Sequence, residues 1–124
     1  MILQQDKPED FAIATGESHT VREFCQAAFA HAGMPLEWRG EGLEETGVST
    51  EDGRVLVAID PRYFRPTEVE TLLGDPSKAK KVLGWEAKTP FSQLVKEMAA
   101  GDLEAAKRDA MIREAGYKTF DYHE

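Results

Sequence analysis

Two arginines and a glutamate lie close together in one proline-bracketed stretch of the chain. Arg62 and Arg65 stand three residues apart, and Glu68 follows three residues later. A guanidinium group donates a planar fork of hydrogen bonds that matches phosphate oxygens. Pro66 stiffens the backbone that holds Arg65, and Glu68 would accept a hydrogen bond from a neighbouring nucleobase or sugar. The spacing therefore suits recognition of an anion.

A second interpretation of these arginines needs no ligand. Arginine pairs on loops are commonly solvated, and Arg62 and Arg65 would then pair on the surface with Asp60, Glu68 or Asp75. Such exposed ion pairs contribute little to stability. The residues alone leave both interpretations open.

Composition limits the other classes of function. The 124 residues carry a net charge of −8 and are 41% hydrophobic, which predicts a single globular domain with a modest core. An acidic chain lacks the basic surface that non-specific nucleic-acid or anionic-membrane binding needs. One cysteine, Cys25, excludes an internal disulfide and favours a cytoplasmic setting. No apolar run is long enough to span a membrane.

The elements that must position the arginines begin with a strand, a turn and a helix. The apolar run 11–15 predicts a buried strand that ends at Gly16. Thr20 and Glu23 have the spacing of a capping box that starts a helix, and Gly33 ends it. The apolar face of that helix is expected to comprise Val21, Phe24, Cys25, Ala28, Phe29 and Ala32.

The middle of the chain predicts a hairpin. Residues 36–38 suggest a short strand, and 54–60 the returning strand, with 55–59 buried. Residues 39–53 hold four glycines and five carboxylates, which predicts a solvated loop or hairpin tip rather than a calcium site.

The second half of the chain predicts several helices. Residues 67–73 suggest one or two helical turns. Asp75 with Pro76 predicts a helix start, and Gly84 its end, with Ala79, Val82 and Leu83 facing the core. Thr89 would cap a helix that ends at Gly101 and buries Phe91, Leu94, Val95 and Met98, and a last helix would run from Leu103 to about Ala115.

Several familiar sites are missing from the sequence. It has no Gly-x-Gly-x-x-Gly dinucleotide fingerprint and no Gly-x-x-x-x-Gly-Lys phosphate loop. Its three histidines are scattered without a second ligand at metal-binding spacing. Cys25 falls on the apolar face of its helix, which favours an inert core thiol. No catalytic, cofactor-binding or metal-binding residues are therefore predicted.

Three blocks of sequence resemble a known family. They are Ala14-Thr-Gly-Glu17 with Val21-Arg-Glu-Phe24, then Arg62-Tyr-Phe-Arg-Pro-Thr-Glu-Val69, then Gly74-Asp-Pro-Ser-Lys-Ala79 with Leu83-Gly-Trp85. Together they are similar to the C-terminal part of GDP-mannose 4,6-dehydratases, which are extended short-chain dehydrogenases/reductases. The third block is shared more widely among nucleotide-sugar epimerases and dehydratases. The resemblance covers residues 2 to about 117.

The resemblance implies a fold and a site. The family has an N-terminal Rossmann lobe, which holds NADP and the catalytic residues, and a C-terminal lobe that binds the GDP-sugar. Residues 1–124 would be an incomplete copy of the second lobe: an α/β fragment with a few short strands, about four or five helices and no Rossmann lobe. Arg65 matches the family arginine at the GDP diphosphate, and Glu68 matches the acid beside it. Arg62 receives no firm role.

Three functional hypotheses follow from the resemblance. The chain is the GDP-sugar-binding part of a dehydratase that converts GDP-mannose to GDP-4-keto-6-deoxymannose, it is a stand-alone binding module, or it is a subunit that completes a site with a separate Rossmann chain. In each case we expect the chain alone to be inactive and to bind no NADP. Because a missing lobe would leave an apolar face exposed, self-association is also expected.

Overall fold

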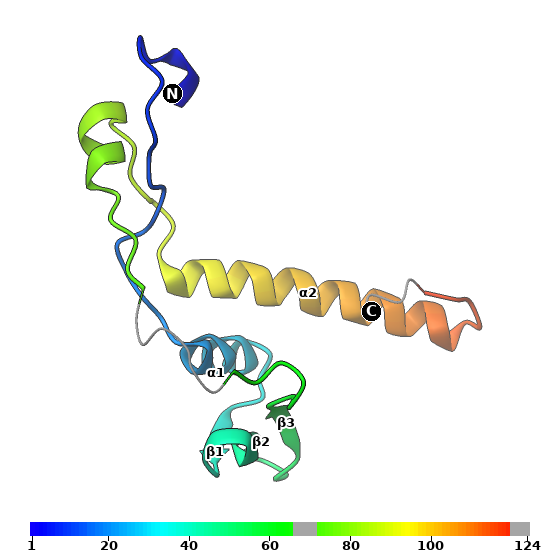
Figure 1. Cartoon of the computed structure of the whole chain (residues 1–124). Coiled ribbons are helices and arrows are strands. Elements are labelled where there is room, and N and C mark those ends of the chain that lie inside the picture. Colours follow the sequence, from blue (N-terminus) through cyan, green and yellow to red (C-terminus); the bar gives the residue numbers. More distant parts are fainter. Residues whose placement is uncertain (66–71, 120–124) are drawn as a thin grey trace.

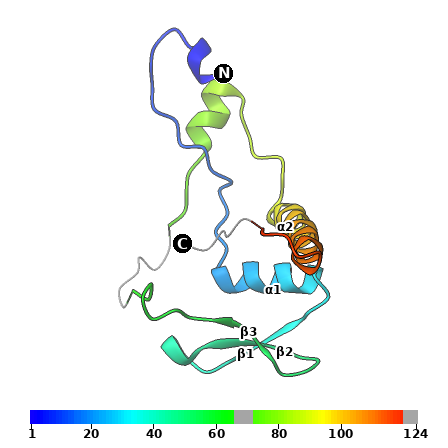
Figure 2. The ribbon, with the colours of Figure 1, turned by 90° about the vertical axis from the view of Figure 1, so that its right-hand side faces the viewer.

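The computed structural model describes residues 1–65 and 72–119 of the chain. Within these ranges the elements are η1 (Ile2–Gln4), α1 (Val21–His31), β1 (Leu36–Arg39), η2 (Gly42–Glu44), β2 (Thr46–Ser49), β3 (Val55–Ala58), the π-helical turn η3 (Ala79–Leu83) and α2 (Phe91–Glu114). They form a small α/β structure in which α1 lies between the sheet and α2 (Figure 1, Figure 2). The predicted turns at 67–73 fall largely outside the described residues.

Helix α1 forms where the sequence predicts it. The Thr20 hydroxyl accepts a hydrogen bond from the Glu23 backbone N–H at 3.1 Å, and the Glu23 carboxylate accepts one from the Thr20 N–H at 2.8 Å. This reciprocal pair is a capping box. The expected apolar face is half-buried from Phe24 onward, whereas Val21 is 79% exposed.

The sheet is an antiparallel meander in the order β1-β2-β3. Strands β1 and β3 form at the predicted residues, but the predicted hairpin between them is wrong, because each pairs with β2 instead. The loop expected at 39–53 is also wrong, since it contains η2 and the central strand β2. Gly47 on β2 leaves room for Trp38 of β1. A Cβ there would lie 3.1 Å from the Val57 Cβ and 3.3 Å from the Trp38 ring, so this glycine allows the indole to lie across the strand.

Strand β3 is less buried than its apolar sequence suggested. It forms one edge of the sheet, and Val55 at its start is 59% exposed. The buried residues of the sheet are instead on β2: Gly47, together with Val48 and Ser49 at 4% and 5% exposure.

Residues 11–15 do not form the predicted strand. They are extended but have no partner strand within the described residues, and Ile13 is 53% exposed. This segment belongs to an N-terminal arm that runs beside residues 74–78. Lys78 ties the two together: its Nζ lies 2.8 Å from a Glu9 carboxylate oxygen and donates to the Asp10 carbonyl at 2.9 Å.

The short helix that ends at Gly84 agrees in outline with the sequence. The Asp75 carboxylate accepts a hydrogen bond from the Ser77 N–H at 2.9 Å, and Gly84 adopts a left-handed conformation with φ +66°. Ala79 and Leu83 are buried as expected. Val82, expected in the core, is 48% exposed.

Helix α2 replaces the two helices that the sequence predicted. It continues through Gly101, because an interior glycine costs only about 1 kcal/mol relative to alanine and does not force a stop. Pro90 occupies the N-cap position, and no side chain caps the helix, so the Thr89 cap is wrong. Val95 is buried at 1% exposure, whereas Leu94 and Met98 are nearly half exposed.

The chain exposes much more surface than a compact protein of its size. Its accessible surface is 10592 Å², whereas a compact monomer of this mass exposes about 6,600 Å². Among the described residues only four apolar side chains are buried: Val48, Ala79, Leu83 and Val95. A large apolar surface of this chain is therefore left without a packing partner.

Candidate anion-binding loop

The predicted site begins where β3 ends. Strand β3 stops at Ala58, and the chain then makes a turn in which the Asp60 carbonyl accepts a hydrogen bond from the Tyr63 N–H at 3.1 Å. Pro61 occupies the second position of this turn, where its fixed φ is favoured. The sheet thus carries a tight turn that leads directly to Arg65.

Arg62 is paired within this turn. Its backbone N–H donates to Asp60 Oδ1 at 2.9 Å, and its Nη2 donates to Asp60 Oδ2 at 2.7 Å. The Arg62 Nε lies 3.1 and 3.2 Å from the two carboxylate oxygens. These bonds lower the pKa of Asp60 and raise that of Arg62. The surface-pairing interpretation is therefore confirmed for Arg62, whose partner is Asp60.

Arg65 differs from Arg62 in its surroundings. It lies on the exposed part of the loop and forms no ion pair with any residue in 1–65 or 72–119. Glu68 lies outside the described residues, so its position relative to Arg65 stays a prediction. The structure thus separates the two arginines: Arg62 is held by Asp60, while the Arg65 guanidinium is presented at the surface.

Two carboxylates of the acidic segment 39–53 form local ion pairs. Glu45 forms an ion pair with Arg22 of α1, whose guanidinium lies 5.5 Å from the centre of the Trp38 ring. Asp52 pairs with Arg54 at 2.5 Å. No cluster of three His, Cys, Asp or Glu side chains suited to a metal occurs in the described ranges. These acids therefore act as local structural partners.

Two other side chains that could carry chemistry are either partly buried or paired with a neighbouring residue. Cys25 is half-buried on α1, and burial raises the pKa of its thiol, which disfavours the reactive thiolate. Lys80, on the exposed side of η3, pairs with Glu86 at 2.9 Å. In the described part of the chain, no helix has both the length and the apolarity needed to cross a bilayer.

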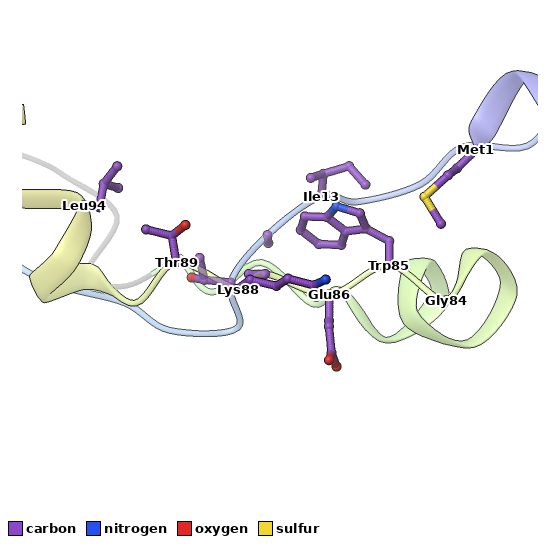
Figure 3. A pocket seen from close by; sticks show the side chains of 11 residues that line it. Met1, Ile13, Gly84, Trp85, Glu86, Lys88, Thr89 and Leu94 are labelled. Carbon is purple, nitrogen blue, oxygen red and sulfur yellow. The ribbon is translucent and has the colours of Figure 1, made fainter. Parts of the chain in front are cut away.

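An open apolar cavity of about 560 Å³ lies between the N-terminal arm and the segment after η3. Figure 3 shows Trp85 facing Ile13 at its centre, with Met1 beyond one end and Leu94 beyond the other. In the sequence, Trp85 stood out only as the last residue of the third family block, and no binding role was predicted for it. The apolar run 11–15 supplies Ile13, Ala14 and Thr15 to the lining of this cavity, although its composition alone predicts a buried strand.

The sequence of this chain matches one family of known proteins over most of its length. A sequence model described as GDP-mannose 4,6 dehydratase matches residues 1–98. The chain belongs to the GDP-mannose 4,6-dehydratase family. It is 56% identical over 110 residues to GDP-mannose 4,6 dehydratase 2 of Caenorhabditis elegans and 54% identical over 107 residues to GDP-mannose 4,6 dehydratase of Dictyostelium discoideum. The human GDP-mannose 4,6 dehydratase is 48% identical over 104 residues.

These matches cover most of this chain but a minor part of each relative. They span 89%, 86% and 84% of the chain, and 28%, 30% and 28% of the three dehydratases. The chain therefore corresponds to less than a third of the length of these curated members of the GDP-mannose 4,6-dehydratase family.

Proposed function

We propose that the chain is the GDP-sugar-binding part of a GDP-mannose 4,6-dehydratase, an extended short-chain dehydrogenase/reductase that converts GDP-mannose to GDP-4-keto-6-deoxymannose. The observation that carries the proposal is the family match over residues 1–98, which includes the loop that presents Arg65. The relatives' names supply the substrate, and the exposed guanidinium supplies a group that fits a diphosphate.

Binding is the role that these residues can perform. The Arg65 guanidinium would donate two parallel hydrogen bonds to diphosphate oxygens, and Glu68 would accept from the GDP moiety. Because Arg62 is neutralised by Asp60, Arg65 provides the net positive charge of the described part of this loop. That charge is needed locally in a chain whose net charge is −8.

The described residues do not fit NADP. Their sheet is an antiparallel meander, whereas a dinucleotide site of the usual kind is built at a helix N-terminus that follows a parallel strand and a glycine-rich turn. We therefore assign hydride chemistry to a Rossmann lobe in the same polypeptide or another one, and no activity to these residues alone. The unpartnered apolar surface supports such a partner, and also self-association. We assign the enzyme to the cytoplasm.

A chimera tests the proposal. The matching 107 residues of the Dictyostelium dehydratase are replaced by their counterparts from this chain, and GDP affinity is measured by calorimetry. We expect the chimera to bind GDP and convert GDP-mannose. Arg65→Ala should weaken GDP binding by about 10- to 150-fold, which corresponds to a hydrogen bond between charged groups. The GDP affinity of Arg65→Lys should lie between those of the unchanged chimera and Arg65→Ala, because lysine keeps the charge but lacks the planar fork of donors.

The matched control is Arg39→Ala. Arg39 lies on β1, is exposed and pairs with Glu37 at 3.2 Å, so the variant changes net charge equally without touching the loop. A folded Arg65→Ala chimera with the affinity of the Arg39→Ala control would refute the site. Saturable micromolar binding of NADPH to the 124-residue chain would contradict the assignment of the cofactor to another lobe.

A further inference from the structure

The carboxylate and the backbone carbonyl of the half-buried Asp60 both accept hydrogen bonds within the turn. Both of its oxygens accept hydrogen bonds from Arg62, one at 2.9 Å from the backbone N–H and another at 2.7 Å from Nη2. Its carbonyl accepts from the Tyr63 N–H at 3.1 Å, and the Arg62 guanidinium lies 5.4 Å from the Tyr63 ring centre. One residue therefore fixes both the backbone and the side chains of the turn.

The segment that leads to Arg65 is short and starts from a turn that is anchored on the sheet. On one side it follows β3, whose Val57 and Ala58 are in register with Gly47 and Thr46 of β2. On the other side, Arg65 is only two residues beyond Tyr63, a reach of at most about 7 Å. Pro66 disfavours helical backbone conformations at Arg65. A change in the turn is therefore transmitted to Arg65 through very few rotatable bonds.

The same contacts decide which arginine is available to a ligand. Both carboxylate oxygens of Asp60 accept hydrogen bonds from the Arg62 guanidinium. The positive charge of Arg62 is therefore compensated, and its Nε and Nη2 donors are occupied. If Asp60 were removed, Arg62 would become a competing cation three residues from Arg65. The pair thus restricts anion binding to one guanidinium of the two in the described loop.

We propose that Asp60 is a positioning residue for the diphosphate-binding arginine: it locks the turn that carries Arg65 and holds Arg62 away from the ligand. The proposal rests on the proposed function, since it assumes that Arg65 binds the GDP diphosphate. It assigns to Asp60 an effect on affinity without contact with the nucleotide.

The first test measures positioning directly in the 124-residue chain without ligand. Asp60→Ala should increase the hydrogen exchange rate of the Tyr63 amide and lower the ¹⁵N order parameter of Arg65. Asp60→Asn should preserve both, because its side-chain oxygen still accepts from the Arg62 N–H. Unchanged dynamics at Arg65 in a folded Asp60→Ala variant would overturn the proposal.

The matched control is Asp52→Ala at the β2–β3 turn. Asp52 repeats the same arrangement, because its Oδ1 accepts from the Arg54 N–H at 3.1 Å and its Oδ2 accepts from the Arg54 Nε at 2.5 Å. Its removal should loosen that turn and leave Arg65 and GDP affinity unchanged. An equal effect of Asp52→Ala on Arg65 would show general destabilisation and overturn the specific role of Asp60.

The second test is a double-mutant cycle on GDP affinity in the 124-residue chain and the chimera. Asp60→Ala should weaken GDP binding by about 5- to 10-fold, the scale of a lost local hydrogen bond. The Asp60→Ala/Arg65→Ala pair should bind no more weakly than Arg65→Ala does, because the turn then positions no ligand-binding arginine and Arg62 is released. Multiplicative losses would overturn the proposal. Loss of the Arg65→Ala effect itself would refute the proposed function instead, so the two failures are distinguishable.

Discussion

Gly74 provides the sharpest test of how the N-terminal arm is held. A Cβ at this position would lie 2.5 Å from the Ala14 Cβ, whereas carbon atoms in contact stay about 3.5–4.0 Å apart. Gly74→Ala therefore forces the arm and the segment at 74–78 apart by at least 1 Å, a step estimated from that contact distance. Overpacking of this kind costs about 1–3 kcal/mol.

The assay has two readouts. Urea unfolding followed by circular dichroism gives the change in stability, and the indole resonance of Trp85 reports whether the arm still covers the cavity that contains Ile13. We expect Gly74→Ala to lower the midpoint and to shift the Trp85 resonance. Ala14→Gly in the same background should restore both, because it removes the other atom of the clash.

Gly101→Ala is the control with the opposite sign. Gly101 lies inside α2 and has no atoms within 4 Å of an added Cβ, so alanine should stabilise the helix by about 1 kcal/mol. A Gly74→Ala variant with unchanged stability and an unchanged Trp85 resonance would refute the close contact between the arm and residues 74–78.

Three further predictions follow from the caps, the carboxylates and the surface. Thr20→Ala removes the cap of α1 and should cost about 1 kcal/mol in urea unfolding, while Thr50→Ala, outside any helix cap, should cost less. Hydrogen bonds lower the pKa values of Glu23, Asp52, Asp60 and Asp75 in the folded state. The stability that these carboxylates contribute is present above their unfolded pKa values of about 4 and should be lost as pH falls through the lower folded values. An unfolding midpoint that stays flat from about pH 5 to 2 would contradict this expectation. The excess exposed surface predicts self-association in light scattering that grows with concentration, and a monodisperse compact monomer would contradict this expectation.

The local signals of the sequence predicted the elements that depend on local interactions. The α1 capping box needs only Thr20, Glu23 and the backbone between them, so its geometry is contained in four residues. Gly84 similarly marks the end of a helix by its left-handed conformation. Strand β2 gave no such signal, because Thr46–Ser49 has a single large apolar residue and its strand form depends on pairing with both neighbours.

Two predictions from the sequence are wrong, each for a physical reason. The run 11–15 has the composition of a buried strand, yet a strand needs a partner to bond its backbone, and the arm has none in the described residues. Gly101 resembles a helix end, but a glycine stops a helix only when its left-handed freedom is used, and α2 does not use it.

The candidate site was predictable in part. The sequence identified the loop and offered Asp60 as one of three partners for its arginines, and the structure selects Asp60 for Arg62. It could not separate Arg62 from Arg65, because that depends on which guanidinium reaches the carboxylate after the turn forms. The roles of Arg65 and Glu68 in binding stay predictions.

The contact between Lys78 and the N-terminal arm also bears on the order of folding. Lys78 and Asp10 are separated by 68 positions in the chain, whereas β2 and β3 are joined by a short turn. Closing the longer loop costs about 2 kcal/mol more in chain entropy than closing a hairpin of about six residues. The meander should therefore form first, and the arm should dock last and detach first. Transient opening would then expose Trp85 before the sheet or α1 unfolds.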